Sequence, residues 1–85
     1  MLAAKLIDNV WATRKAENLN GLKFMLAEEI SPQENSRRLI VVDTIGAGIG
    51  DRVIVATGSS ARYMLENNPP VDAIVIGIID EDCHF

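Results

Sequence analysis

Short runs of apolar, β-branched residues alternate with polar breakers along most of the chain. The breakers contain Asn, Gly, Ser or Pro and lie at residues 18–21, 31–36, 46–51 and 67–70. Val- and Ile-rich runs occupy residues 39–42, 52–57 and 71–80. Short runs of this kind, bounded by turn-forming residues, are typical of strands. The pattern therefore predicts a protein built mainly from short β-strands.

Residues 22–30 fit two secondary structures. Alternate positions are apolar while Lys23 and Glu29 face the other way, which is the pattern of a half-buried strand. An apolar stripe at helical spacing also runs through Met25 and Ile30, and Met, Leu, Ala and Glu all favour helices. Periodicity alone leaves this segment undecided between strand and helix.

Residues 60–67 carry the clearest helical signals. Ser59 or Ser60 can cap the first backbone amides, and the asparagines before Pro69 can end the helix. Several short strands, regular turns and one short α-helix together predict a mainly β fold, in the form of a small β-barrel.

Composition indicates one small domain, residues 1–85, with too little core to remain alone. A chain of 9.3 kDa should expose roughly 5,000 Å² when folded, against about 13,500 Å² when unfolded. Hydrophobic residues make up 48% of the chain but aromatic residues only 5%, so the core must consist of small aliphatic side chains. Such a thin, apolar domain is expected to gain further burial by forming oligomers.

Charge excludes several classes of partner. Twelve acidic residues outnumber eight basic ones, and the resulting net charge of -4 is a poor electrostatic match to the phosphate backbone of nucleic acid. The longest apolar stretch, residues 73–79, is too short to cross a membrane. Lys5 and Asp8 interrupt any signal-peptide core, and a lone Cys83 cannot form an internal disulfide. We therefore expect a soluble, cytoplasmic domain.

The glycine-rich segment 43–51 suggests a nucleotide site, because glycine lets backbone amides approach a phosphate. The dinucleotide fingerprint, however, requires a glycine where this chain has Asp51, and no Gly-Lys-Ser/Thr ending is present. An acidic residue there would also repel a pyrophosphate. The pattern favours a tight connection between strands that uses positive φ angles, or the close approach of a neighbouring chain.

Two further motifs contain residue types that can carry chemistry. Residues 58–62, Gly-Ser-Ser-Ala-Arg, could hold an anion at a helix start with Arg62 as counter-charge, although a helix cap is the better interpretation. A serine nucleophile there would lack both flanking glycines and a histidine base. The tail, residues 80–85, combines acids with Cys83 and His84 but lacks metal-ligand spacing. We predict no catalysis, no cofactor and no metal.

Taken in order, the motifs resemble the vertex proteins of bacterial microcompartment shells, of the EutN/CcmL type. The resemblance covers nearly the whole chain and is carried by residues 10–15, 19–23, 43–51, 58–62, 70–73 and 77–80. It implies a small five-stranded OB-like β-barrel with one short α-helix at about residues 60–67, and a strand at 22–30. It also implies a cytoplasmic shell location and a homopentamer, with a hexamer possible, that closes shell corners beside hexameric or trimeric tile proteins.

Departures from that family concern three segments. Many relatives have a glycine near position 8, where this chain has Asp8 and Asn9, so the first strand is expected to be shaped differently. The loop at residues 31–38 is short, and the tail at 82–85 matches no family feature.

The resemblance and the packing of copies round an axis also suggest which residues shape the barrel's connections and the contacts between subunits. That set is Asp43, Gly46, Ala47, Gly48, Gly50, Ser59, Ser60, Arg62 and Asp72. The alternative function is a small oligomeric module that binds an anion or nucleotide at residues 58–62. A small nucleic-acid binder is disfavoured by acidity and few aromatics.

Overall fold

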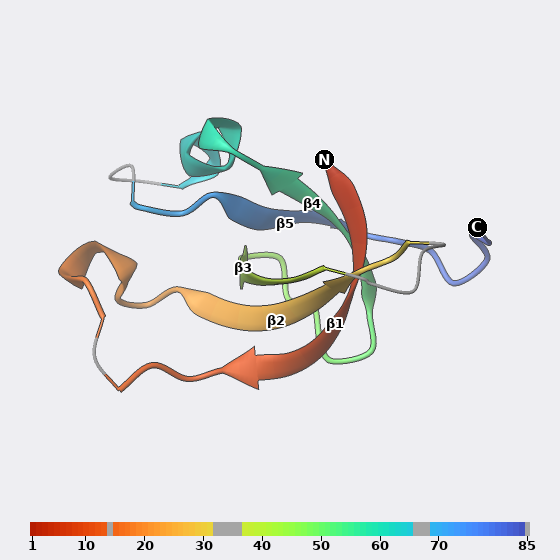
Figure 1. Ribbon diagram of the computed structural model, residues 1–85, viewed down its shortest axis with the longest axis horizontal. Helices are drawn as coiled ribbons and strands as arrows, with labels where there is room; N and C mark the ends of the chain where they lie inside the picture. The colour runs from red at the N-terminus through yellow and green to blue at the C-terminus, as the bar shows by residue number, and fades with distance from the viewer. Residues whose placement is uncertain (14, 32–36, 66–68, 85) are drawn as a thin grey trace.

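Five strands form a closed barrel in the computed structural model, which describes residues 1–13, 15–31, 37–65 and 69–84, without the side chains of Ser60 and Arg62 (Figure 1). The strands are β1 (Leu2–Val10), β2 (Lys23–Glu29), β3 (Arg38–Asp43), β4 (Arg52–Thr57) and β5 (Ala73–Ile78). Their order around the barrel is β1-β2-β3-β5-β4. All neighbouring pairs are antiparallel except β3 and β5. The prediction of a mainly β, five-stranded barrel is confirmed.

The first strand closes the barrel because it pairs with two neighbours. Its first half pairs with β4 from Leu2 to Lys5, and most of its length pairs with β2. The β1–β2 register shifts between Leu6 and Asp8, so a bulge bends the strand at this point. Asp8, beside the bulge, is one of the two residues at which the resemblance led us to expect a differently shaped first strand.

Segment 22–30 is a strand, as the resemblance implied. Every residue of β2 from Lys23 to Glu28 pairs with β3, and Met25 and Ala27 point into the barrel and are fully buried. Long-range pairing and burial therefore outweigh the helix propensity of the residues in this segment.

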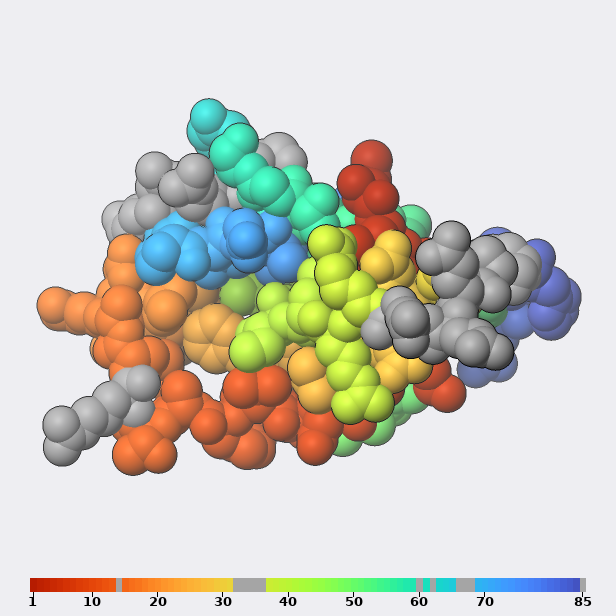
Figure 2. All heavy atoms as spheres, viewed as in Figure 1, coloured from red at the N-terminus to blue at the C-terminus, as the bar shows by residue number. Residues whose placement is uncertain are grey.

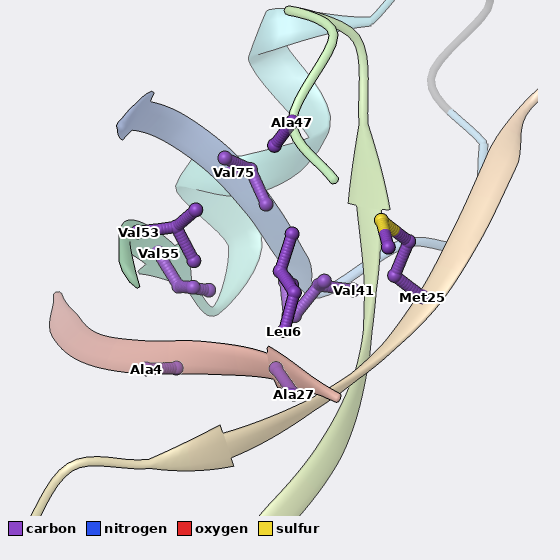
Figure 3. Close-up of a cluster of buried hydrophobic side chains, with 10 residues drawn as sticks. Ala4, Leu6, Met25, Ala27, Val41, Ala47, Val53, Val55 and Val75 are labelled. Carbon is purple, nitrogen blue, oxygen red and sulfur yellow. The ribbon is translucent and has the colours of Figure 1, made fainter. Parts of the chain in front are cut away.

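Small aliphatic side chains fill the barrel interior, where they point toward one another (Figure 3). This inner core consists of Ala4, Leu6, Met25, Ala27, Val41, Ala47, Val53, Val55, Ala73 and Val75. No aromatic ring belongs to it, which agrees with the low aromatic content and with the narrow interior of a five-stranded barrel.

A second apolar cluster covers part of the barrel's outer surface. Val42 belongs to it while its neighbour Val41 faces inward, because successive strand residues point to opposite faces. Ile74 and Ala61 pack against Val42 in this cluster, and Phe24 borders it. Two 3-10 helices, η1 (Glu17–Leu19) and η2 (Ser59–Met64), contribute residues to this outer cluster.

The prediction of an α-helix at residues 60–67 is wrong. The segment is the 3-10 helix η2, over Ser59–Met64, and residues 66–68 of the prediction lie outside the described residues. Ala61 donates its backbone N–H to the Gly58 carbonyl, a three-residue closure that tightens the turn. Eleven residues separate the end of β4 from Pro69, and η2 takes six of them, which is short for a stable α-helix, so packing of the buried Ala61 sets the turn.

Candidate functional site

The buried carboxylate of Asp43 anchors the glycine-rich loop that joins β3 to β4. Only 1% of its side chain is exposed, and one oxygen, Oδ2, accepts the backbone N–H of Ala47 at 2.9 Å. The other, Oδ1, accepts the N–H of Ile45 at 3.2 Å. The Nζ of Lys23 lies 3.1 Å from Asp43 Oδ2 and donates a second hydrogen bond to the Ala47 carbonyl. Asp43 therefore fixes the first half of the loop to the barrel.

Asp51 anchors the second half of the loop. Its Oδ2 accepts the Gly48 N–H at 2.8 Å, and its own N–H donates to the Gly48 carbonyl at 3.1 Å. The loop is also joined to β1, because the Gly50 N–H donates to the Leu6 carbonyl and the Leu6 N–H donates to the Asp51 carbonyl. The loop is consequently held in one conformation by its own protomer.

Two of the loop glycines adopt backbone angles that other residues avoid. The φ angle is 87° at Gly46 and 94° at Gly50, as expected for a tight connection. Gly48 differs, because its φ is not positive and a Cβ there would have only Asp51 Oδ2 nearby, at 3.9 Å. Nothing inside the protomer explains why position 48 is glycine.

The loop does not offer its amides to a phosphate. The N–H groups of Ile45, Ala47 and Gly48 already donate to the carboxylates of Asp43 and Asp51. An incoming anion would have to displace these internal acids and would meet their negative charge. The preference for a tight connection over a nucleotide site is therefore supported.

The second predicted block joins the end of β4 to the segment before β5. The Gly58 N–H donates to the Asp72 carbonyl at 2.8 Å, which brings these two predicted residues together. Ser59 and the Asp72 side chain are exposed, whereas the side chains of Ser60 and Arg62 lie outside the described residues. The block and the glycine-rich loop lie at the two ends of β4, so one protomer does not combine them into a single site.

Burial divides the predicted interface residues into two groups. Asp43 and Ala47 are buried within the protomer, and Ala47 packs over Val75 at the barrel interior (Figure 3). Their local role is to hold the connection. Gly46 and Gly50 are exposed, and a part of Gly48 is accessible. A contact of these glycines with another subunit stays a prediction.

Sequence reasoning missed an exposed aromatic residue. Trp11 follows the end of β1, is 89% exposed and borders a cleft of about 390 Å³ with Leu22 and Phe24. The sequence shows that Trp11 is the chain's single tryptophan. It does not show that Trp11 is exposed, because that depends on where β1 ends. Among the described residues no group of three or more His, Cys, Asp or Glu could hold a metal, and no helix is long and apolar enough to cross a membrane.

Comparisons with known proteins give one consistent family. Residues 1–80 match the family described as ethanolamine utilisation protein EutN/carboxysome. The bacterial microcompartment shell vertex protein GrpN of Rhodospirillum rubrum is 41% identical, with 94% of this chain and 93% of GrpN covered. The carboxysome shell vertex protein CcmL of Synechocystis is 40% identical, with 94% and 83% covered. Among solved structures, the pentameric shell protein MSM0273 from the RMM microcompartment is similar with a TM-score of 0.87, 35% identity, and 100% and 96% covered.

Proposed function

Because the chain belongs to the EutN/CcmL family, we propose that it is a structural shell protein whose ring of copies caps the vertices of a bacterial microcompartment. The observation that carries this proposal is the structural similarity to the pentameric shell protein MSM0273, which covers 100% of this chain and 96% of that protein. The likeness to the vertex protein GrpN likewise covers 94% of this chain and 93% of GrpN.

The protomer surface supports assembly. It exposes 5868 Å², more than the roughly 5,000 Å² expected of a compact monomer of this mass. Large apolar side chains are exposed on several parts of it, among them Trp11, Ile49 and Tyr63. A closed ring of identical copies is heterologous: each copy uses two different surfaces, which meet head to tail. Such a ring would remove part of this apolar surface from water.

The predicted interface set suits such a ring. Gly46, Gly48 and Gly50 carry no side chains, so a neighbouring backbone can approach closely at these positions, between the exposed side chains of Ile45 and Ile49. Asp43 and Asp51 hold this loop in place before assembly, so little conformational entropy is lost when a neighbour binds. At the other end of β4, Ser59 and Asp72 are exposed and belong to a second surface, separate from the loop.

The vertex role also implies the protein's partners, its location in the cell and its lack of catalytic activity. A vertex ring needs flat neighbours, so its partners are hexameric or trimeric shell tiles, and its location is the shell within the bacterial cytoplasm. Among the described residues, no cluster of three or more His, Cys, Asp or Glu side chains could hold a metal ion. The chain's one histidine, His84, is exposed in the tail. We infer that the protein acts by packing alone and catalyses no reaction.

Light scattering on the purified protein tests the ring. Five copies of a 9.3 kDa chain give about 47 kDa and six give about 56 kDa, whereas a monomer would contradict the proposal. A second test mixes the ring with purified shell tile proteins and examines the particles by electron microscopy. Closed polyhedra that require this protein support vertex capping, whereas equally closed particles without it would contradict that role.

A further inference from the structure

One edge of β3 is open over four of its six residues, among the residues that the structure describes. On the side away from β2, β3 pairs with β5 only at Val42 and Asp43. Residues 38–41 have no strand partner on that side among the described residues. Unpaired strand edges readily accept an additional extended segment.

A groove runs beside this open edge. One cleft of about 520 Å³ lies between β3 and the Gly58–Asp72 connection, and a second of about 190 Å³ continues it toward Phe24 and Pro70. The two share Ile40, Asp72 and Ala73, so they form one continuous groove. The space-filling view shows a hollow between the yellow-green atoms of early β3 and the blue atoms before β5 (Figure 2).

The groove combines the apolar side chains of Leu39 and Ile40 with two charged residues, Arg37 and Asp72, of which Arg37 is paired with Glu29. Ile40 leaves 54% of its surface exposed although it lies mid-strand. The Asp72 carboxylate is exposed and makes no hydrogen bond or ion pair with any other described residue. A complementary occupant would therefore present a large apolar side chain and a nearby cation.

The chain carries such a segment elsewhere on its surface. Trp11, in the non-strand segment after β1, is 89% exposed, and Lys15 lines the same small cleft as Trp11. Lys15 is exposed and has no acidic partner among the described residues. Tryptophan, with tyrosine and arginine, is enriched among the energetically dominant contacts of protein interfaces.

Groove and tryptophan are separate surfaces of one protomer. Trp11 lines neither part of the groove, and Phe24 stands between the two surfaces because it borders both. If Trp11 of one copy contacts the groove of a second copy, two different surfaces meet. Repeated in one direction around an axis, such a head-to-tail contact closes a ring. Resting on the vertex-ring function proposed above, we propose that Trp11 of each copy inserts into the groove of the next, with Lys15 paired to Asp72.

Tryptophan fluorescence tests this contact directly, because Trp11 is the only tryptophan in the chain. In the intact wild-type ring, its emission should be blue-shifted and its quenching by acrylamide several-fold weaker than that of N-acetyltryptophanamide. Emission and quenching equal to those of the free compound, in a sample whose mass is that of a ring, would overturn the proposal.

A charge exchange tests the pairing. Lys15→Glu and Asp72→Lys should each raise the protomer concentration at half-assembly by about tenfold, measured by native mass spectrometry over a dilution series. The double variant should restore the wild-type value, because it reverses the pair. Lys5→Glu, an equal charge change at an exposed residue outside both surfaces, is the control and should leave assembly unchanged.

The possible outcomes separate the two proposals. Single variants that assemble as well as Lys5→Glu, or a double variant that fails to recover, would refute the Lys15–Asp72 pairing while the ring stands. A wild-type protein that is monomeric would instead refute the vertex ring itself, and this contact with it.

Discussion

Lys23 and Asp43 lie directly opposite each other in the β2–β3 ladder, and their side chains meet at 3.1 Å where the glycine-rich loop begins. The two residues differ in environment: the Lys23 side chain is 44% exposed, whereas that of Asp43 is nearly inaccessible. The ion pair itself therefore contributes little, since solvent screens the lysine. The carboxylate matters more, because two backbone N–H groups of the loop depend on it.

Replacement of Asp43 should consequently cost more stability than replacement of Lys23. Asp43→Ala leaves the buried Ala47 N–H without an acceptor, and we expect a loss of about 2–4 kcal/mol in the free energy of unfolding. Lys23→Met should cost at most about 1 kcal/mol. Urea unfolding at fixed protomer concentration measures both.

Glu28→Gln provides the control for this pair of variants. Glu28 belongs to the ion pair with Arg38, whose side chains are 39% and 62% exposed, so its loss should change stability by less than about 0.5 kcal/mol. Equal losses for Lys23→Met and Asp43→Ala would show that the salt bridge, and not the loop anchor, carries the stability.

The loop glycines should separate folding from assembly. Gly46→Ala forces a side chain to adopt a φ of 87° and should destabilise the protomer by about 1–2 kcal/mol, although no atom lies within 4 Å of the new Cβ. At Gly48 a Cβ has room inside the protomer, whereas the larger side chain of Gly48→Val should abolish the ring if position 48 faces a neighbour. Urea unfolding and native mass spectrometry distinguish the two effects.

The opposite result at position 48 is equally informative. A Gly48→Val protein with the wild-type ring mass would remove Gly48 from the interface set. Loss of the ring without loss of secondary structure in circular dichroism would retain it, because the fold would then be intact.

How far the sequence predicts this fold differs between segments. Strands such as β4 were predictable, because their Val- and Ile-rich runs are bounded by turn residues. Segment 22–30 was not predictable from periodicity, since its identity as β2 depends on pairing with β3. The α-helix predicted at residues 60–67 was wrong because local capping signals do not reveal that Ala61 must pack against Val42 and Ile74.

The candidate site shows the same division. A tight connection at residues 43–51 followed from its glycines, and Gly46 and Gly50 do adopt positive φ angles. The pairing of Asp43 with Lys23 could not be foreseen, because the residues lie 20 positions apart and meet only through strand register. The groove beside β3 was equally hidden, since it arises where β3 and β5 diverge.

Packing under η2 gives a further prediction. Ala61 is fully buried between the turn and the barrel's outer face, so Ala61→Leu should overfill the outer cluster and lower the free energy of unfolding by about 1–3 kcal/mol. Met64→Lys, at an exposed position on the same turn, should change it by less than about 0.5 kcal/mol. Urea unfolding tests both. A neutral Ala61→Leu would indicate that η2 moves freely on the barrel.

Gly77 in β5 should be replaceable with a gain in stability. Its φ is not in the positive range, and a Cβ would lie 3.6 Å from Ile54 Cδ1, which is an ordinary van der Waals contact on the barrel's outer face. Gly77→Ala should stabilise the protomer by about 0.4–1 kcal/mol, mainly by restricting the unfolded chain. Calorimetry at fixed protomer concentration should therefore show a melting temperature a few degrees higher. A lower melting temperature together with an unchanged ring mass would mean that Ile54 cannot accept even one methyl group, whereas a lost ring would place Gly77 against a neighbouring copy.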